Sequence, residues 1–125
     1  MLGKLVGIGV AGALGSLARY GLAGAVQRAV RGPLPWGTAV VNVVGCFVAG
    51  ALWAAFQDRA GISGEMRAII LIGFMGGFTT FSTYMLETGN LVRDAQWGWA
   101  LGNILFQNLV GLAGLFLGLT VGRLV

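Results

Sequence analysis

The chain alternates four long apolar segments with short polar connections. The apolar segments cover residues 5–26, 36–56, 67–91 and 97–121, and the connections hold both prolines, Pro33 and Pro35. Each segment is close to the roughly 20 residues that a helix needs to cross the hydrocarbon core of a bilayer. The pattern therefore predicts an all-α membrane protein, with residues 1–125 forming a single transmembrane domain of four helices.

The composition excludes a soluble enzyme. Hydrophobic residues make up 57% of the chain and charged residues 10%, and the mean hydropathy is +0.85. Soluble domains usually carry about 25% charged residues, which this chain would lack for a water-facing surface. Histidine is absent and Cys46 is the one cysteine, so the commonest general base, a thiol metal site and an intrachain disulfide are all missing. We expect no enzymatic activity.

The positive charge does not indicate a nucleic-acid partner. The net charge is +4, but the basic residues are scattered singly and form no run that would follow a phosphate backbone. In a four-span topology they divide almost evenly between the two sides, with Lys4, Arg59, Arg67 and Arg123 on one side and Arg28, Arg31 and Arg93 on the other. Because an excess of basic residues normally sets orientation, near balance predicts insertion both ways up and an antiparallel homodimer.

The third apolar segment contains an unusual run, GFMGGFTTFSTY, over residues 73–84. Two glycines followed by two threonines form poor helix sequence, so a break near the middle of this helix is predicted. Backbone that leaves the helix at membrane depth needs a partner, and freed carbonyl oxygens are suitable ligands for sodium. The alternative is a glycine kink in which threonine hydroxyls bond back to the preceding turn.

Neutral hydrogen-bond donors gather in three of the four segments. Phe81 and Tyr84 share one helical face just after the run of glycines and threonines, with the hydroxyls of Ser82 and Thr83 between them. Aromatic rings on one face are usually core packing, but their positive edges also attract an anion. The hydroxyls of Ser82 and Thr83 add hydrogen-bond donors, whereas an ionised carboxylate would only accept.

Amides supply the other donors. Asn42 lies in the second segment, and the fourth brings Asn103 and Gln107 one turn apart on one face, whereas Asn108 points elsewhere. Such residues either join helices or line a path. Because they are amides and hydroxyls rather than carboxylates, they suit an anion better than a metal cation or a proton relay.

Two charged residues fall within or near the spans. Arg19 is the charge inside the first segment, and it either lines an electropositive vestibule or reaches the interface or a carbonyl without a functional role. Glu87 follows Thr79 by about two helical turns, which predicts a position at an interface or vestibule.

Three motifs resemble those of the Fluc (CrcB) fluoride channels, and the resemblance covers essentially the whole chain. They are GALGSLARY at residues 12–20, Asn42 with Gly45 in VNVVG, and GFMGGFTTFST at residues 73–83. The resemblance implies an antiparallel, dual-topology dimer with two fluoride pores and a structural, untransported sodium ion (Na+) buried at its centre. The family's sodium ligands are backbone carbonyls that match Gly76 and Thr79.

The resemblance also implies roles in the anion pathway. The pore asparagine of the family matches Asn42, and its two pore phenylalanines match Phe81 and Tyr84. At position 84 the family pattern has phenylalanine, and this chain departs from it with a tyrosine. The tyrosine hydroxyl would supply a donor or narrow the path. Asn103 and Gln107 occupy the places of a tyrosine and a serine of the family's fourth-span polar track.

The predicted function is passive export of fluoride from the cytoplasm, which lowers its toxicity, in the inner (plasma) membrane of a prokaryote. Fluoride, the lipid bilayer and a second copy of the chain are the expected partners. One alternative is a proton-coupled small multidrug transporter, which needs a glutamate in its first span where this chain has Arg19. Another is a membrane assembly protein without transport, which a flux measurement would distinguish.

Overall fold

The computed structural model describes residues 1–57 and 61–125, and the described chain is helical with no strand. Four helices are long and apolar enough to cross a membrane, as the hydropathy pattern predicts. The elements in chain order are α1 (Leu2–Ala29), α2 (Trp36–Gln57), α3 (Gly64–Ala68), the π-helical η1 (Ile69–Met75), α4 (Gly76–Phe78), α5 (Phe81–Arg93) and α6 (Trp97–Leu124). The third of the four spans, Gly64–Arg93, therefore consists of α3, η1, α4 and α5.

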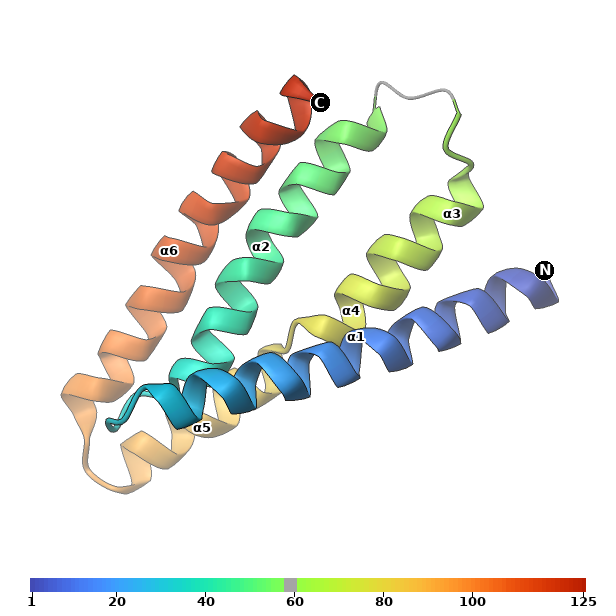
Figure 1. Ribbon diagram of the computed structural model, residues 1–125. Helices are drawn as coiled ribbons and strands as arrows, with labels where there is room; N and C mark the ends of the chain where they lie inside the picture. Colours follow the sequence, from blue (N-terminus) through green and yellow to red (C-terminus); the bar gives the residue numbers. More distant parts are fainter. Residues whose placement is uncertain (58–60) are drawn as a thin grey trace.

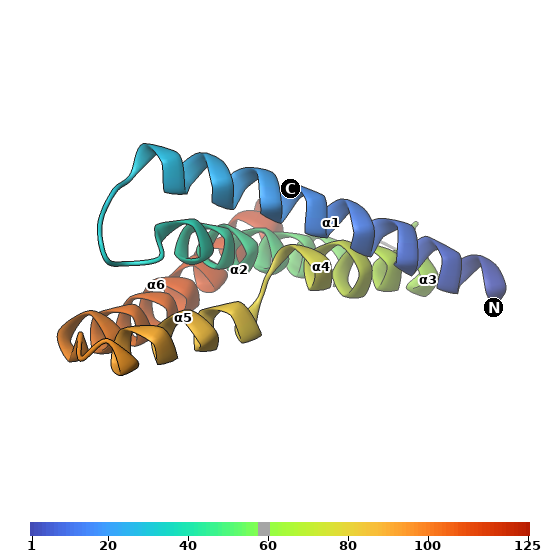
Figure 2. The ribbon, with the colours of Figure 1, turned by 90° about the horizontal axis from the view of Figure 1, so that it is seen from below.

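The helices form two packed groups that share α2. Helices α2 and α6 lie side by side along most of their length, whereas α1 packs across η1 and α4 (Figure 1). After α4 the chain changes course, and α5 packs against the first part of α6 (Figure 2). This arrangement brings polar residues of α2, α5 and α6 together near the junction of α4 and α5.

Glycines allow the closest helix contacts. A Cβ atom on Gly15 of α1 would overlap the carbonyl oxygen of Phe74, and one on Gly118 of α6 would overlap the carbonyl oxygen of Phe47. Small residues permit such backbone approach in lipid, where no hydrophobic effect drives helices together. Gly15 and Gly118 therefore serve helix packing.

The third span is irregular in two places. The π-helical turns of η1 are not visible in the sequence pattern, and the glycines Gly76 and Gly77 remain helical within α4. The extended residues come next: Thr79 has ψ 156° and Thr80 has φ −149° and ψ 113°, between the end of α4 and the start of α5. The Thr79 hydroxyl donates to the Met75 carbonyl at 2.9 Å, which is the back-bonding that the kink interpretation expects.

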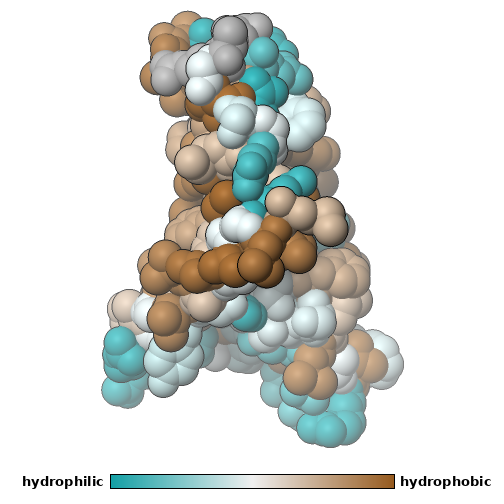
Figure 3. All heavy atoms as spheres, turned by 90° about the vertical axis from the view of Figure 1, so that its right-hand side faces the viewer, coloured by the Kyte–Doolittle hydropathy of each residue, from teal (hydrophilic) through white to brown (hydrophobic). Residues whose placement is uncertain are grey.

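The outside of the chain is suited to lipid. Brown, apolar atoms form a band across the lower middle of the face in Figure 3, and teal, polar atoms lie at its lower end and again in its upper half. Helix α1 buries only Gly15, and most of its leucines and valines are exposed, with Leu22 and Val26 partly buried. Since apolar side chains face outward on helices of spanning length, this is a multi-pass membrane protein. Arg59, one of the charges used to predict its orientation, lies outside the described residues.

Candidate functional site

A chain of hydrogen-bonded amides crosses from α6 to α2. Asn103 Nδ2 donates to Thr88 Oγ1 at 2.9 Å, and Gln107 Nε2 donates to Asn103 Oδ1 at 2.9 Å. Asn42 Nδ2 then donates to Gln107 Oε1 at 2.7 Å. Asn103 and Gln107 therefore do share one face of α6, and the bonds fix which way each amide points. We call these four residues (Thr88, Asn103, Gln107 and Asn42) the amide track.

Asn42 joins the amide track to the extended link between α4 and α5. Its Oδ1 accepts the Thr80 backbone N–H at 2.9 Å, and its Nδ2 also donates to the Thr80 carbonyl at 3.0 Å. Both amide hydrogens of Asn42 are thus donated within the protein. Because of this, an anion that binds at Asn42 has to take the place of the Gln107 or the Thr80 oxygen.

The same bonds change the environment of two backbone carbonyls. In a continuous α-helix the Thr80 N–H would donate to the Gly76 carbonyl, but here it donates to Asn42. The Thr83 N–H would likewise donate to the Thr79 carbonyl, but here it donates to Thr80 Oγ1 at 3.3 Å and caps α5. Both carbonyls therefore lie where the regular helical donor is directed elsewhere.

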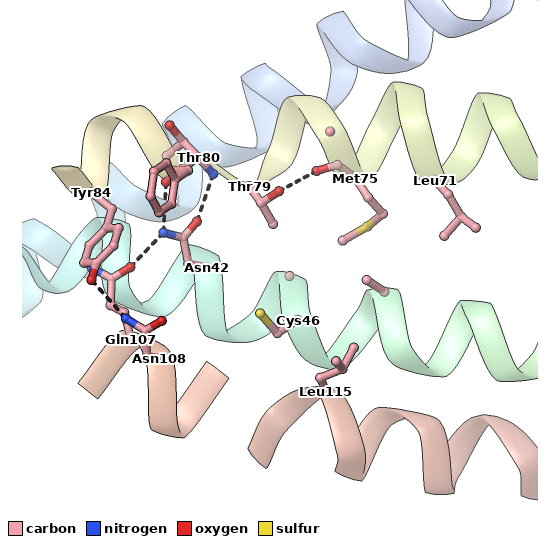
Figure 4. A pocket seen from close by; sticks show the side chains of 14 residues that line it. Asn42, Cys46, Leu71, Met75, Thr79, Thr80, Tyr84, Gln107, Asn108 and Leu115 are labelled. Carbon is pink, nitrogen blue, oxygen red and sulfur yellow. Dashed lines mark hydrogen bonds between the residues drawn. The ribbon is translucent and has the colours of Figure 1, made fainter. Parts of the chain in front are cut away.

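An open cavity of about 460 Å³ lies beside this link (Figure 4). Its polar end is formed by Asn42, Thr80, Tyr84, Gln107 and Asn108, and its other end is largely apolar. The remaining lining residues are Gly45, Cys46, Ala49, Leu71, Met75, Gly76, Thr79, Phe81 and Leu115. We call this space the main cavity.

A second cavity, of about 370 Å³, lies on the α1 side of the link. It is lined by Ser16, Arg19, Tyr20, Ala23, Thr38, Thr80, Thr83 and Glu87, and we call it the arginine cavity. Thr38 Oγ1 donates to Glu87 Oε1 at 2.8 Å, whereas Arg19 Nε and Glu87 Oε2 are buried without a hydrogen-bond partner. Arg19 and Glu87 therefore face a vestibule-like space, and Thr80 borders both cavities.

The structure brings most of the expected anion-pathway residues to one of the two cavities. Asn42, Phe81, Tyr84 and Gln107 border the main cavity, and the rings of Phe81 and Tyr84 meet edge to face at 5.7 Å. Arg19 and Thr83 border the arginine cavity. Ser82 is exposed and is not a lining residue of either cavity, and Asn103 is fully buried within the amide track.

The sequence pattern does not reveal three residues of the site: Asn108, Thr80 and Thr88. Asn108 lies on a different, exposed face of α6 from the buried Asn103 and Gln107, as expected, but it still borders the main cavity and donates to the Tyr84 hydroxyl. The sequence pattern alone does not give Thr80 or Thr88 a role in the site. The one signal for Thr80 was a hydroxyl three residues before Thr83, which is the spacing of a helix cap.

The carbonyls of Gly76 and Thr79 fit a sodium ion in their chemistry. Both residues border the main cavity, and the donors that would normally occupy their carbonyls are directed elsewhere. Neutral oxygens are the ligands that hard alkali cations accept in membrane proteins. In residues 1–57 and 61–125 no group of three or more His, Cys, Asp or Glu side chains would hold a metal instead.

Comparison with known proteins gives consistent matches along the chain. The family model described as CrcB-like protein, Camphor Resistance (CrcB), matches residues 6–119. The chain is 52% identical over 122 residues to the fluoride-specific ion channel FluC of Desulforapulum autotrophicum, with 98% of each chain covered. It is 50% identical over 125 residues to the protein of that name in Solidesulfovibrio magneticus, with both chains covered completely. The counterpart in Nitrosococcus oceani is 47% identical over 122 residues, 98% of each chain.

Proposed function

The chain belongs to the CrcB family, and on this premise we propose that it forms a fluoride-specific channel that exports fluoride from the cytoplasm and lowers its toxicity. The observation that carries the proposal is the identity of 52% to a fluoride-specific ion channel across 98% of both chains. The family is one of ion channels, so the protein is not an enzyme. Its bacterial relatives and four spans support a place in the inner membrane of a prokaryote.

The chemistry of the two cavities supports an anion as the transported species. A fluoride ion that leaves water needs replacement donors, and neutral N–H and O–H groups supply them without trapping the ion as a full charge would. The second N–H of Gln107 and the Thr83 hydroxyl hydrogen are not used in the bonds of the amide track or the α5 cap. Arg19 adds a positive charge at the arginine cavity.

Passive transport is sufficient for export. Fluoride enters cells as its undissociated acid and becomes an anion at near-neutral pH, and the negative interior potential then favours its exit. One elementary charge gains about 2.3 kcal/mol for each 100 mV of membrane potential.

A homodimer with a structural sodium ion completes the proposal. The exposed apolar side chains of α1 and the open main cavity suit a second copy of the chain in the bilayer. Gly76 and Thr79 from each copy would hold the ion through their carbonyls, and its charge would favour anions in nearby pores. Conduction itself is carried by the chain's own donors.

Fluoride release from liposomes tests the channel. We expect purified protein in liposomes to release trapped fluoride, measured with a fluoride electrode, at least about a hundredfold faster than chloride. An order of magnitude corresponds to about 1.4 kcal/mol, so this ratio requires less than the energy of two good hydrogen bonds to a charged group. Protein-free liposomes are the control. Equal release of chloride, or no release of fluoride, would contradict the proposal.

Labelling from each side of the membrane tests dual topology. We expect a cysteine placed at the C-terminal end by Val125→Cys, in a chain that also carries Cys46→Ser, to react with an impermeant maleimide from both sides in comparable amounts. Nearly balanced basic residues give neither orientation a large advantage. The Cys46→Ser chain without the added cysteine is the control. Labelling from one side alone would exclude an antiparallel dimer.

A further inference from the structure

The hydroxyl of Tyr84 accepts a hydrogen bond from Asn108. Asn108 Nδ2 lies 3.0 Å from Tyr84 Oη and 2.8 Å from the Ile104 carbonyl oxygen. A carbonyl oxygen only accepts, so the atom facing it must be the amide nitrogen and not the amide oxygen. Asn108 therefore donates to Tyr84 Oη, and the hydroxyl hydrogen of Tyr84 is left for another acceptor.

That hydrogen has no acceptor among residues 1–57 and 61–125, although Tyr84 itself is well packed. The hydrogen bonds of the described residues include one in which Tyr84 Oη accepts and none in which it donates. The side chain is 5% exposed and is held by the edge of the Phe81 ring, so it is not free to reorient into bulk solvent. Tyr84 borders the polar end of the main cavity with Asn42 and Gln107 (Figure 4).

Other donors at this end of the cavity are largely committed. Both hydrogens of Asn42 Nδ2 go to Thr80 and Gln107, and both hydrogens of Asn108 Nδ2 go to Tyr84 and Ile104. At this end of the cavity the Tyr84 hydroxyl and the second N–H of Gln107 are therefore the donors with a hydrogen to give without breaking an existing bond. An oxygen that accepts one hydrogen bond also becomes a stronger donor in the next.

We propose that the Tyr84 hydroxyl donates to the anion in the main cavity and raises the preference for fluoride, and that Asn108 is its positioning residue. The inference rests on the proposed function and adds a specificity-determining group to it. Fluoride is the strongest hydrogen-bond acceptor among the halides, so one additional O–H donor favours it over chloride. An aromatic edge alone makes less of this distinction, because it acts through a weak, diffuse charge.

The experiment measures current through planar bilayers at increasing fluoride concentration, and then in chloride. Tyr84→Phe removes the hydroxyl and keeps the ring. We expect it to raise the half-saturating fluoride concentration about tenfold and to lower the fluoride-to-chloride ratio by a similar factor. Asn108→Leu leaves the hydroxyl present but unpositioned, so it should give a smaller shift, and it should add nothing in a chain that already carries Tyr84→Phe.

Thr120→Val is the matched control, because it removes a hydroxyl that bonds to the Phe116 carbonyl on the exposed side of α6, away from both cavities. An unchanged half-saturating concentration in Tyr84→Phe, in protein that still conducts fluoride, overturns the inference and leaves the channel intact. Should Tyr84→Phe not fold, an unchanged value in Asn108→Leu overturns it. Wild-type protein that carries no fluoride current overturns the proposed function, and the inference with it.

Discussion

Asn42→Leu is expected to lower fluoride efflux from liposomes by about a hundredfold or more. The substitution keeps the branched shape and the number of heavy atoms of the side chain but removes three hydrogen bonds, two to the backbone of Thr80 and one to Gln107. Each buried polar group left unpaired costs about 1–3 kcal/mol, and the three groups left unpaired here together exceed the roughly 2.8 kcal/mol that a hundredfold change represents. The measurement is the initial rate of fluoride release per folded protein.

The control must separate transport from folding. Asn90→Leu makes the same change on α5 at an amide that borders neither cavity, so it should leave the rate within about twofold of wild type. Asn42→Asp keeps an oxygen for the Thr80 N–H but adds a carboxylate to the anion path, and it should also stop fluoride release. Normal release by both Asn42 variants would place the pathway away from Asn42.

The membrane fold follows from the sequence because its signals are local. Residues 5–26 need no tertiary contact to be apolar, and hydropathy alone separates a membrane span from a soluble helix. Asn103 and Gln107 could be placed together for the same reason, since four residues along a helix return to the same face. Lipid leaves the backbone few alternatives to the helix, so the pattern maps directly onto structure.

The details of the site depend on packing between helices. Asn42 meets Thr80 because α2 lies beside the end of α4, and no spacing along the chain reveals that contact. Asn108 of α6 donates to Tyr84 of α5, a contact that its position on the helix face does not reveal. The π-helical turns of η1 have no composition signal in this chain, because their residues are as apolar as those of a regular span.

At the link between α4 and α5, the Asn42 side chain contacts both the amide track and the backbone that follows the Gly76 carbonyl. By taking the Thr80 N–H, Asn42 diverts the helical donor of the Gly76 carbonyl while it anchors the amide track. The proposed anion path and the proposed sodium site would therefore be coupled through one amide. A loss of sodium affinity in Asn42→Leu would follow from the same geometry.

Gly76→Pro is expected to abolish the effect of sodium on dimer stability, whereas Thr79→Ser should preserve it. Proline removes the Gly76 N–H, which donates to the Gly73 carbonyl, and its ring displaces the preceding turn, so the carbonyls on either side of the substitution shift. Serine keeps the backbone carbonyl of Thr79 and the hydroxyl that bonds to Met75, and loses only the methyl group that lies against Gly45. Thermal unfolding of the purified dimer in sodium and in N-methylglucamine buffers measures the difference.

In wild-type protein, sodium at a hundredfold excess over its Kd should stabilise the folded dimer by about 2.7 kcal/mol, because only the assembled carbonyls bind the ion. Gly76→Ala is the milder variant in case the proline variant does not fold. A Cβ at Gly76 meets nothing within 4 Å in the single chain, and alanine keeps the helical backbone. If Gly76 borders a dimer-centred ion, this small methyl group should still weaken the sodium effect without unfolding the protomer. Equal stability of the wild-type dimer in both buffers, or a sodium effect that survives Gly76→Pro, would remove these two carbonyls from the binding of any cation.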